Sequence, residues 1–219
     1  MKFLSYDSKA SQILIRFSYA CWLNLLWFIC SIPIFTIGAA TTGLYYAMLR
    51  LARDEDGNVT KMFFKSFREN FKQSTVLWLI MLAVGVFLGA DGYVLYHLRL
   101  IAEGPLAVLW TVLLAAVIAL GVFYVILLIW IFPLVASVQN TNREMIKNSF
   151  LIGVRYLFAT ICVAAIHFAV FFITVRFFTP FMLLGEGLCA LLSSLLMLRI
   201  IDACSGSPDE YKEDGETEE

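Results

Sequence analysis

Long apolar segments separated by short polar ones dominate this chain. Five segments are clearly hydrophobic, at residues 17–35, 76–96, 106–136, 157–175 and 181–200. Most of them reach the roughly 20 residues that a helix needs to cross a hydrocarbon core about 30 Å thick. The pattern therefore predicts an all-α fold, a polytopic bundle of membrane helices.

A sixth segment, 36–52, is ambiguous because it is rich in small residues and threonine. Lysine and arginine favour the cytoplasmic side of membrane proteins. If 36–52 crosses, fourteen of these residues lie inside and two outside; if it does not, the best arrangement is eleven inside and five outside. We therefore predict six transmembrane helices, one of them short (36–52), with the N-terminus and the C-terminus in the cytoplasm.

The stretch 59–72, between the second and third spans, has an amphipathic pattern at about 100° per residue. One side is apolar and carries Val59, Phe63, Phe64, Phe67 and Phe71. The other side is basic and carries Lys61, Lys65, Arg68 and Lys72. This pattern predicts a cytoplasmic helix lying in the membrane interface. Its basic side either contacts anionic lipid alone or also docks a cytoplasmic partner.

Composition supports this architecture and defines two terminal segments. The chain is 61% hydrophobic and 15% charged with a mean hydropathy of +0.82, outside the range of soluble domains. Residues 1–16 form a basic cytoplasmic segment, and residues 201–219 form an acidic tail that we expect to be disordered. The start resembles a secretory signal, but its apolar run exceeds the ~7–15 residues of a signal core, so we expect no cleavage.

Polar side chains inside the spans are the candidate functional residues, because such groups are costly in lipid. They are Asn24, Asp91, His167 and Glu186. Asn24 and His167 also fit hydrogen bonds between helices, and Asp91 also fits the wet end of its helix. A cluster at the outer side, in which His97, Glu103 and Arg176 join Asp91 and Glu186, is compatible with the topology.

Signatures of enzymes and of metal sites are missing from the sequence. There is no HExxH, GxSxG, Walker or dinucleotide motif. The five cysteines form no CxxC pair, and there are only two histidines, so we expect no metal site and no cofactor. We expect no nucleic-acid binding either, because the topology explains the basic window. The sequence thus predicts a protein that is not an enzyme.

Small residues at four-residue spacing predict close helix packing. Gly38, Ala39, Thr42, Gly43 and Ala47 have this spacing in the second span, and Gly85 and Gly89 have it in the third. Small side chains let membrane helices approach each other closely.

Four short motifs resemble the YesL family, bacterial membrane proteins of unknown function. They are NLLW at 24–27, SIP at 31–33, TIGAATT at 36–42 and FFKSFRENFKQS at 63–74. The motif residues that we take as characteristic are Pro33, Gly38, Thr41, Thr42, Phe64 and Phe67. The resemblance covers about residues 10–95.

The resemblance implies a role in carbohydrate uptake. Such proteins are commonly encoded beside carbohydrate-uptake transporters and polysaccharide-degrading enzymes. It implies a non-enzymatic accessory or regulatory component, with the lipid bilayer and sugar ABC transporter subunits as partners. The alternative is a small solute transporter or channel, because Pro33 followed by a short Gly/Ala/Thr-rich helix resembles the discontinuous segments of transporters.

Overall fold

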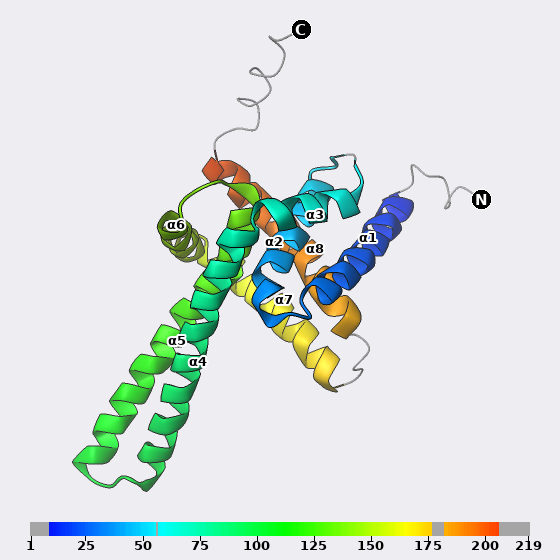
Figure 1. Ribbon diagram of the computed structural model, residues 1–219. Coiled ribbons are helices and arrows are strands. Elements are labelled where there is room, and N and C mark those ends of the chain that lie inside the picture. Colours follow the sequence, from blue (N-terminus) through cyan, green and yellow to red (C-terminus); the bar gives the residue numbers. More distant parts are fainter. Residues whose placement is uncertain (1–8, 56, 177–181, 206–219) are drawn as a thin grey trace.

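The structure, a computed structural model, is helical throughout the residues that it describes, 9–55, 57–176 and 182–205 (Figure 1). The helices are α1 (Lys9–Cys30), α2 (Ile37–Ala52), α3 (Val59–Glu69), α4 (Phe71–Ile101), α5 (Pro105–Ser137), α6 (Asn142–Arg155), α7 (Leu157–Arg176) and α8 (Met182–Ser205). A short 3-10 turn, η1 (Ile34–Thr36), precedes α2. The all-α prediction is confirmed for the described residues.

Four helical segments are long and apolar enough to cross a membrane, judged by length and composition alone. They are Ser11–Cys30, Phe71–Ile101, Pro105–Ser137 and Leu157–Arg176. The other two predicted spans, α2 and α8, do not reach this standard within the described residues. α2 has only 16 residues, and α8 carries Glu186, Arg199 and Asp202.

Several helix ends differ from the predicted segment boundaries. α1 begins at Lys9, inside the predicted segment 1–16, and ends at Cys30 instead of residue 35. The chain turns there because Pro33 has no N–H to continue a helix and because the Thr36 hydroxyl lies 2.6 Å from the Cys30 carbonyl. The predicted helix 59–72 ends at Glu69, so residues 71 and 72 belong to α4. α8 runs to Ser205, into the predicted tail 201–219, of which 206–219 lie outside the described residues.

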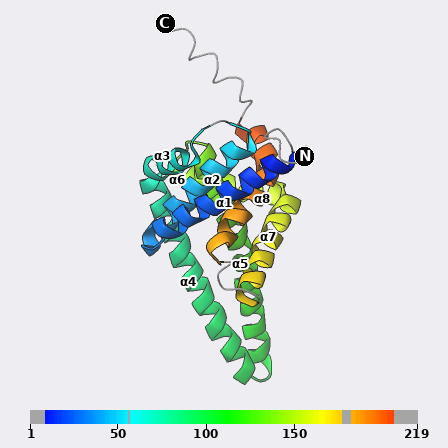
Figure 2. The ribbon, with the colours of Figure 1, turned by 90° about the vertical axis from the view of Figure 1, so that its right-hand side faces the viewer.

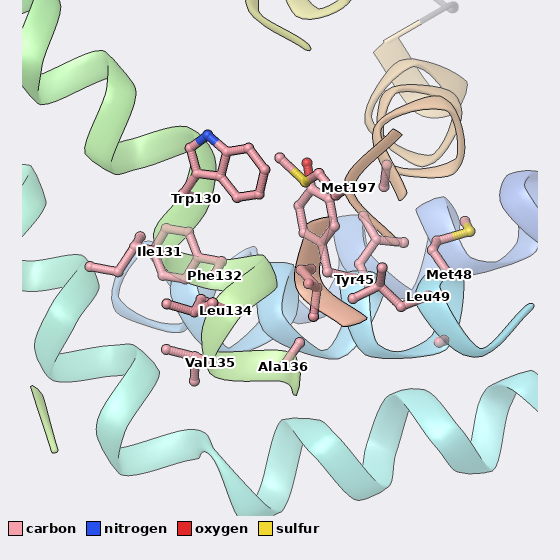
Figure 3. Packing of buried hydrophobic residues seen from close by; sticks show 14 of the residues in the cluster. Tyr45, Met48, Leu49, Trp130, Ile131, Phe132, Leu134, Val135, Ala136 and Met197 are labelled. Carbon is pink, nitrogen blue, oxygen red and sulfur yellow. The ribbon is translucent and has the colours of Figure 1, made fainter. Parts of the chain in front are cut away.

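Helix α2 forms the centre of the bundle. It packs against α1, α3, α4, α5 and α8, and its Leu44 and Met48 are 0% exposed. Figure 3 shows Tyr45, Met48 and Leu49 of α2 near Met197 of α8 and the buried end of α5. This end of α5 contributes Trp130, a fully buried side chain. A short helix that is surrounded in this way needs little contact with lipid.

Helices α4 and α5 form a hairpin that projects from the bundle (Figures 1 and 2). α5 has 33 residues, which corresponds to about 50 Å at 1.5 Å per residue. Its outer part is apolar yet exposed, with Val112 and Ile118 each 60% exposed. A helix that is apolar all round is typical of a membrane span.

The basic stretch 50–72 and helix α6 lie at one end of the bundle (Figures 1 and 2). Helices α3 and α6 lie there together with the turn between α2 and α3 (Figures 1 and 2). The start of α1 and the end of α8 lie at the same end of the bundle. The turn between α4 and α5 and the end of α7 point the opposite way. The basic stretch 50–72 thus lies at the end of the molecule opposite to the tip of the hairpin.

Candidate functional site

Helix α3 presents a basic surface. Its first turn is capped by Asn58, whose Oδ1 accepts hydrogen bonds from the backbone N–H groups of Thr60 and Lys61 at 3.0 and 3.2 Å. Opposite the core, the side chains of Lys61, Lys65 and Arg68 are exposed, and so is that of Lys72 in the first turn of α4. We call these four residues the basic face. Within the described chain, no ion pair joins any of them to a carboxylate.

A row of phenylalanines fixes α3 from the other side. Phe63 is 0% exposed and lies against Gly43 of α2, where an added Cβ would be 3.0 Å from the Phe63 carbonyl oxygen. Phe64 and Phe67 are half-buried, with ring centroids 5.3 and 6.1 Å from that of Phe63. Phe71 continues the row into α4, 5.5 Å from Phe67. The basic face is therefore held on a rigidly packed helix.

The arginines at the end of α2 have a different environment. Arg50 pairs with Glu55 at 3.2 Å, and Arg53 pairs with Asp202 at the end of α8. Their charges are thus matched within the fold, which contrasts with the basic face. The stretch 50–72 therefore contains two kinds of basic residue. Arg50 and Arg53 form ion pairs within the fold, whereas the residues of the basic face are exposed and can contact lipid or a partner.

A cavity of about 530 Å³ lies between α1, α2, α4, α5, α7 and α8. Its walls are mostly apolar, and five of its side chains are aromatic: Trp27, Tyr45, Trp78, Phe132 and Phe168. Thr41, His167 and Glu186 add polar groups. Phe168 is 69% exposed, so the cavity reaches the outside of the bundle beside α7. The structure thus brings together two of the four predicted intramembrane residues, His167 and Glu186.

The polar groups of this cavity are mainly hydrogen-bond acceptors. His167 Nδ1 lies 2.9 Å from the Val163 carbonyl, which only accepts, so Nδ1 carries a proton and donates it to that carbonyl. The indole N–H groups are already used: Trp27 donates to Thr41 Oγ1 at 3.0 Å, and Trp78 donates to the Ile34 carbonyl at 2.8 Å. Among the described residues, no hydrogen bond or ion pair involves the Glu186 carboxyl group.

Asn24 has a structural role. It is 0% exposed, and its Oδ1 accepts a hydrogen bond from the Gly187 backbone N–H of α8 at 2.6 Å. An added Cβ at Gly187 would lie 2.4 Å from the Ala20 carbonyl oxygen. Asn24 therefore bonds α1 to α8 at a place where the two helices are in tight contact, in agreement with the alternative of a hydrogen bond between helices.

The cluster at the outer side, which the topology allows, does not form among the described residues. Asp91 is exposed on the projecting part of α4. Glu186 lines the cavity, and no other member of that cluster does. The His97 ring instead packs against Tyr93 and Tyr96 of its own helix, with centroids 4.4 and 5.6 Å apart. The hairpin carries Asp91 and His97 away from the bundle that contains α8, so the cluster does not form.

Three of the characteristic motif residues, Pro33, Gly38 and Thr42, serve the turn before α2 and the packing of that helix. Pro33 precedes η1, and its carbonyl accepts from the Thr36 N–H at 2.9 Å. An added Cβ at Gly38 would lie 2.5 Å from the Ser74 carbonyl oxygen. Thr42 Oγ1 lies 2.8 Å from Ser74 Oγ. These contacts hold α2 against α4, as the spacing of small residues predicts.

The similar prediction for the third span is only half correct. An added Cβ at Gly85 would lie 2.6 Å from the Tyr124 hydroxyl oxygen of α5. At Gly89 an added Cβ would meet nothing within 4 Å. Gly85 is thus at a helix contact and Gly89 is not.

Helix α6 and most of the cavity wall were not predicted. α6 has a capping box: Thr141 N–H and hydroxyl donate to Glu144 Oε2 at 3.0 and 2.9 Å, which lowers the pKa of Glu144. The Thr-x-x-Glu spacing could have indicated this helix. No comparable signal marks Trp27, Trp78 and Phe132 as neighbours, because they come from three helices far apart in sequence.

No metal site is evident in the described residues. They contain no group of three or more His, Cys, Asp and Glu side chains that could hold a metal ion. The cysteines Cys21, Cys30, Cys162 and Cys189 are free thiols. No candidate catalytic group beyond the carboxyl and imidazole of the cavity emerges from the described part of the chain.

Comparison with known proteins supports the resemblance found in the motifs. Residues 20–92 match the family described as "Protein of unknown function, DUF624". The chain resembles the YesL family, as its motifs predict. The "Uncharacterized protein YteU" of Bacillus subtilis (strain 168) is 27% identical over 161 residues, covering 73% of this chain and 69% of the relative. The "Uncharacterized protein YesL" of the same strain is 26% identical over 179 residues, covering 80% and 79%. No solved structure matches the chain.

Proposed function

We propose that this YesL-like protein is a six-span protein of the bacterial plasma membrane with both termini in the cytoplasm. The proposal is supported by the clustering of the basic stretch, α6 and the described ends of α1 and α8 at one end of the bundle (Figures 1 and 2). In this orientation α2 and α8 cross as helices sheltered by their neighbours. α3 lies in the cytoplasmic interface, with its phenylalanines toward the bundle and its basic residues toward water and lipid head groups.

Within this architecture, the protein acts as a non-enzymatic accessory or regulatory component of carbohydrate uptake. The observation that carries the docking role is the basic face, because it combines exposed, unpaired charge with a rigid support. Charged surfaces of this kind steer and orient an acidic partner. The partner class, sugar ABC transporter subunits, follows from the resemblance to the YesL family.

Co-purification with matched charge variants tests this role. The wild-type protein, tagged and extracted in mild detergent, should retain sugar ABC transporter subunits. Lys61→Gln/Lys65→Gln should lose them, because it removes half of the basic face. The control Arg143→Gln/Lys147→Gln removes two exposed charges from α6 at the same end of the molecule and should retain them. Absence of transporter subunits from the wild-type sample, or equal loss in both variants, would contradict the proposal.

A small transporter or channel is the alternative function. The cavity with Glu186 and His167 favours it, whereas the exposed position of Asp91 and the tight packing at Gly38 argue against a path beside α2. Uptake by proteoliposomes separates the two functions. Flux of a sugar or ion through the purified protein alone would favour the transporter.

A further inference from the structure

The cavity beside His167 has an unusual balance of polar groups. Its fixed donors, the indole N–H groups of Trp27 and Trp78, are occupied by protein acceptors. Its carboxyl group has no protein donor among the described residues. A carboxylate without a partner in an apolar environment is costly. The Glu186 carboxyl group is therefore available to accept hydrogen bonds from a ligand.

The walls also suit a cation. Five aromatic side chains line the cavity, and aromatic faces attract ammonium groups through their quadrupoles. A sugar fits less well, because each hydroxyl needs partners and the remaining wall is aliphatic. A primary ammonium instead has three N–H donors, which the Glu186 carboxylate and the Thr41 and Tyr45 hydroxyls can accept.

A second cavity adjoins the first. It measures about 510 Å³, lies between α4, α5 and α7, and is lined almost entirely by apolar residues. Val125, Ile129 and Ala164 line both cavities. A ligand with its head group beside Glu186 thus has an apolar space for a tail next to it. This space lies beside the hairpin, whose exposed apolar residues indicate that it faces lipid.

We propose that the two cavities together bind an amphiphile with a primary ammonium head and an alkyl tail. The head lies between Glu186 and His167 among the aromatic rings, and the tail passes Ala164 into the apolar cavity. Entry is lateral, beside Phe168. The ligand is either a membrane lipid with a primary amine in its head group or a free long-chain amine, since both carry the same recognised chemistry.

Equilibrium binding of decylamine to the full-length protein tests the proposal. The protein is placed in nanodiscs of phosphatidylcholine, which has no primary amine, and partition into empty nanodiscs is subtracted. Decylamine should bind at least about tenfold more tightly than decanol or butylamine, which lack the ammonium and the long tail respectively. Glu186→Gln should weaken decylamine binding about tenfold or more, since hydrogen bonds to a charged group are the strong ones.

Matched variants keep the test specific. Asp91→Asn removes an exposed carboxylate from the projecting hairpin, away from the cavity, and it should leave decylamine binding unchanged. Ala164→Phe narrows the junction of the cavities and should reduce decylamine affinity to that of butylamine. Thermal unfolding of each variant checks that it is folded. Equal binding of decanol and decylamine, or equal weakening in Glu186→Gln and Asp91→Asn, would overturn the proposal.

Replacing part of the phosphatidylcholine by phosphatidylethanolamine identifies the source of the ligand. Competition with decylamine supports a lipid head group as the occupant. Undiminished decylamine binding supports a free long-chain amine.

Discussion

Replacing Gly38 by alanine should destabilise the bundle more than the same replacement at Gly43, the other glycine of α2. The new Cβ would lie 2.5 Å from the Ser74 carbonyl oxygen, 2.6 Å from Trp78 Cβ and 3.0 Å from Phe132 Cε1. The first two are a backbone atom and an atom fixed to the backbone, so α2 and α4 must move apart. That movement also strains the hydrogen bond between Thr42 and Ser74.

The magnitude follows from two opposing effects. Overpacking of this kind costs about 3 kcal/mol, and the higher helix propensity of alanine returns about 1 kcal/mol. The net loss is about 2 kcal/mol, or roughly a thirtyfold shift of the unfolding equilibrium. Gly89→Ala is the matched control, because an added Cβ there meets nothing within 4 Å. This control should be as stable as the wild type or up to about 1 kcal/mol more stable.

Reversible unfolding in mixed micelles, followed by circular dichroism, measures both variants. The account predicts a lower midpoint for Gly38→Ala alone. A Gly38→Ala protein as stable as the wild type would refute the claim that α2 and α4 are in backbone contact. Equal destabilisation by both substitutions would show that glycine is needed for reasons other than packing.

The remaining predictions concern two other junctions. Asn24→Ala should lower the unfolding free energy by about 1 kcal/mol, because it removes the acceptor for the Gly187 N–H. Gly187→Ala should cost about 2 kcal/mol in the same unfolding assay, since the new Cβ would lie 2.4 Å from the Ala20 carbonyl oxygen; a neutral effect would contradict the close contact of α1 and α8. Hydrogen bonds from the Thr141 N–H and hydroxyl hold the pKa of Glu144 below its usual value. The Glu144 carboxylate therefore stabilises the fold fully above the ordinary glutamate pKa of about 4.3. This stabilisation is lost as the pH falls through the lowered pKa of Glu144 in the folded protein. Unfolding between about pH 3 and 5 should depend on pH less steeply in Glu144→Gln, and an unchanged profile would show that the capping box does not stabilise α6.

Hydropathy predicted the long helices well because α4, α5 and α7 are uniformly apolar. It placed the start of α1 too late, because the first turns of that helix contain Ser11, Gln12 and Arg16. Polar residues do not prevent a helix that lies at the same end of the bundle as the basic stretch 50–72. α6 was missed for the same reason: its sequence is mixed, and only its cap residues indicate where it begins.

The candidate site was only partly predictable. The cost of charge in lipid pointed to Glu186 and His167, and both line the cavity. The same argument pointed to Asp91, which the projecting hairpin leaves exposed. Sequence alone does not tell how far a hairpin extends from its bundle. It also does not place Trp27, Trp78 and Phe132 around one cavity, because that depends on how six helices pack.

Cysteine accessibility in intact cells tests the orientation on which the account rests. In a variant without the native cysteines, Lys65→Cys places a thiol on the basic face, and Glu103→Cys places one in the turn between α4 and α5. A maleimide that cannot cross the membrane should label Glu103→Cys in intact cells and Lys65→Cys only after the membrane is opened. Labelling of Lys65→Cys from outside intact cells would contradict the six-span arrangement with both termini in the cytoplasm.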